Sequence, residues 1–159
     1  MFHPIAAAPT PILNARRAHD LSPSDACVHG FFGMISIFSG DLGDALAALG
    51  RDALLSPQTI SWVDFHTGHA LLWAGDDAGA QTSLQRYIDA EPNDPWGQIM
   101  LAVAQGFAGR PDAAREAVAE ALRLQAGLDQ DQVRRSNCYR DPARLDRVVA
   151  VLSEAGLPA

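Results

Sequence analysis

Two histidines three residues apart are the side chains in this chain best suited to chemistry. His66 and His69 lie in the stretch HTGHALLWAGDDAGA (66–80), which also holds a tryptophan and two aspartates. A zinc-binding histidine pair usually has three to five intervening residues, whereas this pair has two, and no glutamate stands three residues before His66. Metal binding is therefore the weaker alternative. We expect the histidines to provide hydrogen bonds to a partner and to titrate near their ordinary pKa of about 6.5. The affinity for that partner would then vary between pH 6 and 7.

The rest of the sequence provides no second set of catalytic residues. No serine lies in a strand-to-helix elbow, and Cys27 and His29, two residues apart, would point to different sides of a helix. Cys27 and Cys138 are too few for a disulfide framework, and we expect both to be small buried side chains. We expect no enzymatic activity and no cofactor.

Composition limits the classes of partner. The chain has 159 residues, 48% of them hydrophobic, and a net charge of −7. This length suits one folded domain, and the negative charge disfavours nucleic acid and anionic membrane surfaces. No stretch approaches the ~20 apolar residues that span a bilayer, and no basic residues precede the apolar N-terminal run. These features predict a soluble, cytoplasmic protein.

Glycine, alanine and proline recur with a period of 34 or 35 residues. Pro23, Pro57 and Pro92 form one series; Gly40, Gly75 and Gly109 form a second, and an alanine follows each of these glycines by five residues, at Ala45, Ala80 and Ala114. Each unit predicts a helix, a turn at the glycine, a second helix and a turn at the proline. The elements that position the histidines are thus the helices of a repeat.

These markers resemble the tetratricopeptide repeat. The family's small residue at position 8 is matched by Gly33, Gly68 and Ala102, and its position 20 by the three alanines. Position 27, alanine in the family, is Asp52, Tyr87 and Ala121, and Ala126 stands where the third unit would have proline. The resemblance covers about residues 12–126, as a half repeat (12–23) and three repeats (24–57, 58–92 and 93–126). The prolines at positions 4, 9 and 11 predict an extended lead-in (1–11), and we expect a linker with a C-terminal capping helix to follow the repeats (127–159).

The C-terminal segment YRDPARLDRVVAVLSEAGLPA resembles the segment that closes such repeats in bacterial signalling proteins, where they follow a nucleotide cyclase or winged-helix domain. Asp141 is suited to cap a helix with Pro142 at its first position, and Gly156 to end it. The preceding polar stretch LDQDQVRRSN predicts one short helix. The expected fold is an all-α, right-handed superhelix whose last repeat is covered by this helix.

The resemblance implies that the first helix of each repeat lines a concave groove. The large side chains at the groove positions include all three tryptophans, and the predicted partner-binding residues are Phe31, Met34, Phe38, Trp62, Phe65, His66, His69, Trp73, Trp96, Met100 and Phe107. The alternative for these residues is burial in the core, under the C-terminal tail (127–159) or against a second copy. We expect the groove to bind a peptide or helix of another protein or of a further domain; self-association through FFGMISIF (31–38) is the alternative function.

Overall fold

The computed structural model describes residues 11–159, and every regular element within them is a helix. The predicted lead-in falls outside this range except for Pro11. The elements are α1 (Pro11–Leu21), α2 (Ala26–Ser39), α3 (Leu42–Leu55), the 3-10 helix η1 (Pro57–Thr59), α4 (Ile60–Ala74), α5 (Asp77–Ala90), α6 (Pro95–Phe107), α7 (Pro111–Leu124), α8 (Gln130–Ser136) and α9 (Pro142–Glu154).

Three glycines end the first half of each hairpin. Gly40, Gly75 and Gly109 have φ angles of 94°, 80° and 70°, in the left-handed region. Glycine adopts this region without the steric cost that a Cβ would impose, so it lets each helix end and the chain reverse. The predicted turns at these three positions are therefore confirmed.

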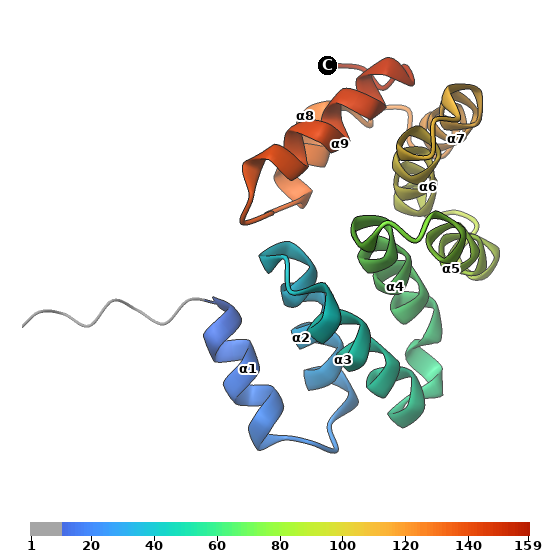
Figure 1. Cartoon of the computed structure of the whole chain (residues 1–159). Coiled ribbons are helices and arrows are strands. Elements are labelled where there is room, and N and C mark those ends of the chain that lie inside the picture. Colours follow the sequence, from blue (N-terminus) through green and yellow to red (C-terminus); the bar gives the residue numbers. More distant parts are fainter. Residues whose placement is uncertain (1–10) are drawn as a thin grey trace, which may run out of the picture.

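The hairpins α2–α3, α4–α5 and α6–α7 stack into a right-handed superhelix of tetratricopeptide-like units, with α1 packed before the first (Figure 1). Small residues allow the two helices of a hairpin to approach closely. A Cβ added at Gly68 would lie 2.7 Å from Cγ of Leu84 and 3.1 Å from the carbonyl oxygen of Ala80, and Gly33 is placed similarly against Leu49. The expected all-α fold is confirmed, and so is the role of the small residues in it.

Two glycine substitutions should therefore have opposite effects on stability. Gly68→Ala should destabilise the protein by about 1–2 kcal/mol, because the new methyl group overlaps Leu84 and the backbone of α5. Gly50→Ala, inside α3 with nothing within 4 Å of the added Cβ, should stabilise it by about 0.5–1 kcal/mol. Urea unfolding followed by circular dichroism measures both changes. A Gly68→Ala protein as stable as Gly50→Ala would contradict this account of hairpin packing.

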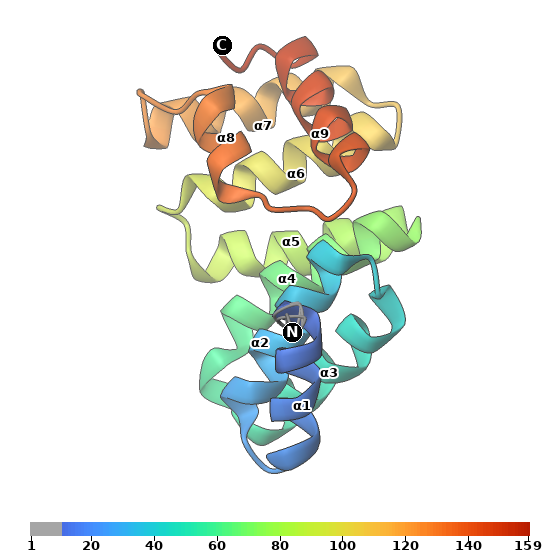
Figure 2. The same cartoon turned by 90° about the vertical axis from the view of Figure 1, so that its left-hand side faces the viewer.

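The tail lies over the concave side of the last hairpin. In Figure 2, α8, α9 and the segment that joins them lie in front of α6. Asp141 caps α9 by accepting a hydrogen bond from the Ala143 amide at 3.0 Å, as the sequence predicts. Gly106 of α6 leaves room for this helix, since an added Cβ there would overlap Cγ1 of Val151. The predicted capping helix thus packs against the inner face of α6.

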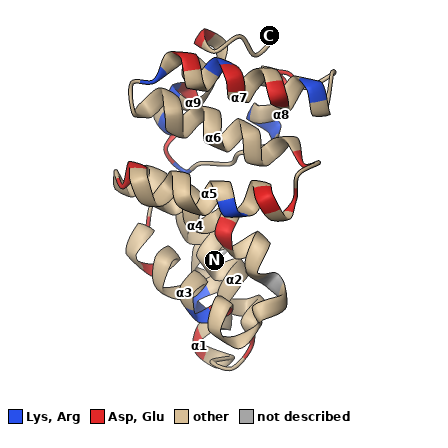
Figure 3. Cartoon of the chain, turned by 90° about the vertical axis from the view of Figure 1, so that its right-hand side faces the viewer, with Lys and Arg blue, Asp and Glu red and all other residues tan. Residues whose placement is uncertain are grey.

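The first helices of the three hairpins carry almost no charge. Between them, α2, α4 and α6 contain one acidic residue, Asp64, and no lysine or arginine, and their ribbons are tan almost throughout in Figure 3. Most of the charged side chains belong to the second helices, the turns and the tail. Within residues 11–159, no helix is both long and apolar enough to cross a bilayer.

Candidate functional site

The concave face is divided into a half that the tail covers and a half that stays open. Both halves are built on α4, whose side chains Trp62, His66, His69 and Trp73 follow one side of the helix. We call the region around His69, Trp73 and Phe107 the closed half and the concavity around Trp62 and His66 the open groove. The segment between α8 and α9 crosses the concave face and separates the two halves (Figure 2).

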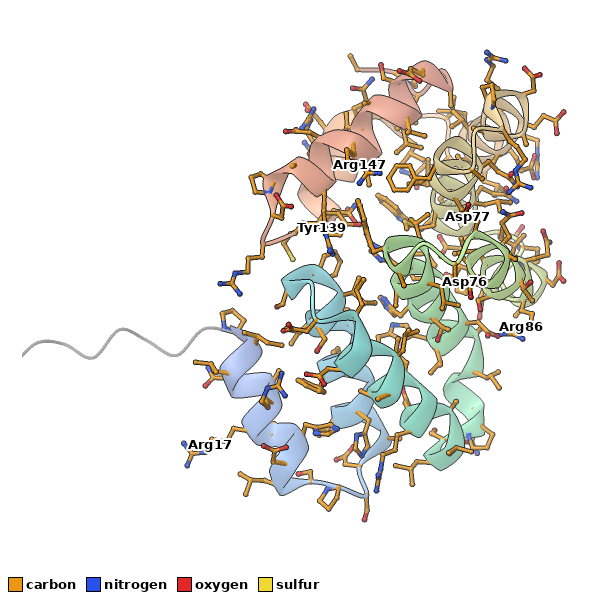
Figure 4. The ribbon with its side chains drawn as sticks, in the orientation of Figure 1. Arg17, Asp76, Asp77, Arg86, Tyr139 and Arg147 are labelled. Carbon is orange, nitrogen blue, oxygen red and sulfur yellow. The ribbon has the colours of Figure 1, made fainter. Side chains whose placement is uncertain are left out.

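Tyr139 fills the closed half. In Figure 4 its side chain points from the segment between α8 and α9 toward the ends of α2 and α4. The indole Nε1–H of Trp73 can only donate, so the Tyr139 hydroxyl accepts from it at 3.3 Å, and the same hydroxyl is hydrogen-bonded to Nε2 of His69. The Phe38 ring packs against Tyr139, with centroids 5.1 Å apart. Burial raises the pKa of Tyr139 to about 12, so the hydroxyl stays protonated at neutral pH.

Two arginines of α9 complete the cover. The Arg144 guanidinium lies 4.8 Å from the centroid of the Trp73 ring, and that of Arg147 lies 4.6 Å from the centroid of Phe107. The backbone amide of Arg140 also donates to the Phe38 carbonyl oxygen at 2.8 Å. The tail is therefore bound to α2, α4 and α6 by aromatic, cation–π and backbone contacts together.

The open groove is a concavity of about 340 Å³ on the same face. Side chains of α2, α4 and α6 form its floor, and Ser136 and Asn137 of the tail form one wall. Its lining residues are Met34, Phe38, Trp62, Phe65, His66, His69, Tyr87, Asp94, Trp96, Met100, Ser136 and Asn137. A second, more apolar hollow of about 610 Å³ continues from it through Met34, Phe38 and Ser136 toward Pro11 and Arg140. The two form a continuous surface suited to an extended chain.

One carboxylate lies at the edge of the open groove. The Tyr87 hydroxyl donates to Oδ2 of Asp94, while Oδ1 of the same side chain accepts from the Trp96 amide at 3.1 Å and so caps α6. Burial, the Asp94 hydrogen bond and the nearby acidic charges raise the pKa of Tyr87. Of the described residues that line the open groove, Asp94 carries the one formal charge.

Both histidines are buried and uncharged at neutral pH. Burial lowers the pKa of His66 to about 4. Burial, with smaller contributions from the charges of His66 and Arg144, lowers the pKa of His69 to about 3. The expectation that these side chains titrate between pH 6 and 7 is therefore wrong, because the sequence alone does not show how fully the neighbouring helices and the tail remove them from water.

The predicted groove residues occupy three environments. Phe31 is 58% exposed at the outer edge, where its ring centroid lies 6.1 Å from that of Trp62. Trp73 and Phe107 belong to the closed half, which corresponds to the alternative of burial under the tail. His69 lies at the boundary, because it is hydrogen-bonded to Tyr139 and also lines the open groove. The remaining predicted residues line the open groove: Met34, Phe38, Trp62, Phe65, His66, Trp96 and Met100. Their role in binding a partner stays a prediction.

Sequence reasoning missed Tyr87, Asp94, Asn137 and Tyr139. The signal for Tyr87 was present, because it replaces the small residue expected at position 27 and must project beyond the hairpin contact. A second signal was Gly106, a glycine at a groove position, which indicates that another element packs closely there. Nothing local marks Tyr139, since its hydrogen-bond partner His69 lies 70 residues earlier in the sequence.

The metal alternative and the cysteine prediction find no support in the described part of the chain. Residues 11–159 contain no group of three or more histidine, cysteine, aspartate or glutamate side chains placed to hold a metal ion. Cys27 and Cys138 are exposed thiols rather than buried side chains. The correction has a simple cause: Cys27 lies in the first turn of α2 and Cys138 in the segment between α8 and α9, where no later element covers them.

Comparison with known proteins identifies a fold and no family. No protein-family model and no curated protein matches the sequence. Among solved structures, two crystal structures of MamA are similar to this chain at 19% identity, with TM-scores of 0.64 and 0.63; each covers 91% of this chain, and 84% and 78% of the MamA chain. MamA from Desulfovibrio magneticus RS-1, residues 41 to the end, gives 16% identity and a TM-score of 0.63 over 91% of this chain and 85% of that one.

Proposed function

We propose that this protein is a non-catalytic interaction module that binds a segment of another protein in the open groove. The observation that carries the proposal is the apolar concavity, lined by aromatic rings, on the part of the inner face of this helical-repeat fold that the tail does not cover. Aromatic and methionine side chains such as Trp62, Trp96 and Met34 are the residue types that contribute most to protein contacts. We also propose that the protein acts in the cytoplasm, either in bacterial signalling or as a regulatory part of a larger protein.

Capture of a partner should depend on the open groove. From an extract of the source organism, the intact chain should retain a partner that a Trp62→Ala, Trp96→Ala variant binds at least tenfold more weakly, as expected for central aromatic anchors. Leu54→Ala is the matched control, because Leu54 is 84% exposed on α3, away from the groove. Circular dichroism should show all three proteins equally helical. The same captured proteins in equal amounts from all three would contradict the proposal.

Self-association is the second candidate, favoured by the exposed apolar side chains at the N-terminal end of the superhelix. Phe31 and Ile60 are 58% and 53% exposed, and Leu55 is 44% exposed. Within the segment 31–38, however, Phe32 is buried against α1 and Ile37 is buried in the core with Ala45 and Leu49, so neither is free to contact a second copy. Sedimentation over a range of concentrations decides between a monomer and a dimer formed through this end.

A further inference from the structure

Helix α4 carries two tryptophan–histidine pairs, and the structure shows what one of them binds. Trp62 and His66 form the first pair and His69 and Trp73 the second, each four residues apart and therefore adjacent on the helix. Trp62 and Trp73 are eleven residues apart, close to three full turns, so both pairs face the same side. The second pair holds the Tyr139 hydroxyl between His69 Nε2 and the Trp73 indole.

The first pair has the same chemistry, and no tyrosine or other residue that the structure describes lies hydrogen-bonded between its two rings. The rings of Trp62 and His66 are in contact, with centroids 4.2 Å apart, and both side chains line the open groove. His66 is 7% exposed, and its Nδ1 is buried without a hydrogen-bond partner. An unpaired buried polar atom costs stability, so a hydrogen-bonding group brought to this histidine would recover free energy that the unbound protein lacks.

The tail shows which chemical groups this surface accepts. It presents a phenol, directly followed in sequence by Arg140, and two further arginines whose guanidinium groups lie over the rings of Trp73 and Phe107. The open groove offers comparable ring faces at Trp62, Phe65 and Trp96. The Asp94 carboxylate also lines the open groove, and its oxygens can accept further hydrogen bonds beyond those from Tyr87 and the Trp96 amide. Neither α2, α4 nor α6 provides a cation to neutralise it, and the chain as a whole carries a net charge of −7.

We propose that the open groove binds an extended segment of another protein in which an aromatic residue neighbours an arginine or lysine. The aromatic ring packs on Trp62 and brings a hydrogen-bonding group to His66, and the cation lies beside Asp94. The aromatic residue thus repeats, about two helical turns earlier on α4, the contacts that Tyr139 makes with His69 and Trp73 in the closed half. This inference rests on the proposed function and specifies the chemistry of its partner.

A short synthetic peptide tests the inference on the full chain. The probe is an acetylated, amidated decapeptide of alanine and glutamine with a central Tyr-Arg, and its controls replace Tyr by Leu or Arg by Glu. The three tryptophan indole N–H signals in ¹⁵N NMR spectra serve as the readout, assigned by single Trp→Phe variants. We expect the signals of Trp62 and Trp96 to shift with a Kd below about 1 mM, while that of Trp73, under the tail, stays in place.

The controls separate the chemistry of the partner from the use of the groove. Each control peptide should bind at least tenfold more weakly. The Asp94→Asn variant, which keeps a good helix cap, should bind the Tyr-Arg peptide and its Arg→Glu control equally. Equal binding of all peptides to the intact chain, or shifts at Trp73 alone, would overturn the inference.

A library of displayed random peptides, selected on the intact chain and counter-selected on Trp62→Ala, distinguishes the two levels of the proposal. Enrichment of aromatic–cationic pairs supports the inference. Groove-dependent peptides of another composition would overturn it and leave the proposed function standing. If no groove-dependent peptide were selected, both the inference and the proposed function would be overturned. The same would follow if sedimentation showed a dimer that Trp62→Ala disrupts, because a second copy would then occupy the groove.

Discussion

Acid should destabilise the folded protein steeply below pH 6.5, through the two histidines that the fold keeps neutral. In the folded chain the pKa values of His66 and His69 are about 4 and 3, against about 6.5 in an unfolded chain. Below pH 6.5 the unfolded state therefore binds protons that the folded state does not. By linkage, stability is fully present above this pH and is lost as the pH falls toward the folded pKa values.

The size of this effect follows from the two shifts. Each histidine removes about 1.4 kcal/mol of stability per pH unit between its unfolded and folded pKa values, so the pair together removes about 5 kcal/mol between neutral pH and pH 4.5. A domain is stable by only about 5–15 kcal/mol, so this loss is a large part of the total.

Urea unfolding at pH 7.5, 6.5, 5.5 and 4.5 measures the loss. The matched control is the His66→Gln, His69→Gln variant, whose side chains keep hydrogen-bonding capacity but do not titrate. This variant should be less stable at pH 7.5 and should depend less on pH below 6.5, so that the difference between the two proteins narrows by several kcal/mol. Because the carboxylates are common to both, their own pH dependence largely cancels in that difference. Parallel curves for the two proteins would contradict the burial of neutral histidines.

The fold could be predicted from the sequence because its markers act locally. Gly40, Gly75 and Gly109 end helices through their own backbone conformation, and Gly68 permits close packing by lacking a side chain. Asp141 caps α9 through an amide two residues away. Each effect requires only neighbouring residues or the repeat itself, and a period of 34 or 35 residues therefore contains enough information to place the hairpins.

The division of the concave face could not be predicted in the same way. It depends on contacts between α4 and a segment about 70 residues later, and no periodicity links them. The spacing of His66 and His69 places both on the groove side of α4 and does not distinguish them, yet His69 is hydrogen-bonded to Tyr139 and His66 is not. The expected pKa values of the two histidines were wrong for the same reason, because the desolvation of a side chain depends on all the elements that surround it. Sequence reasoning thus located the surface but not its cover.

The tail should contribute as much to stability as a core helix, and Leu152→Ala is the substitution that tests this. Leu152 lies in α9, is fully buried and belongs to the same core as Val103 of α6 and Val118 of α7. Truncation of such a leucine removes buried apolar surface and leaves a cavity, so we expect a loss of about 2–5 kcal/mol in the free energy of unfolding. Ser153→Ala, at the exposed neighbouring position, should change stability by less than about 0.5 kcal/mol.

Amide hydrogen exchange should show where the Leu152→Ala loss is felt. In a repeat protein each unit contacts mainly its neighbours, so exchange should accelerate most in α6, α7 and α9 and least in α2 and α3. If Tyr139 and Arg147 hold the closed half as the structure shows, Trp73 should also become more accessible, and its fluorescence should shift to the red. Equal acceleration in every helix, or a stability like that of Ser153→Ala, would contradict a capping role. The expected pattern would mean that the helix which stabilises the last repeat also sets where the open groove ends.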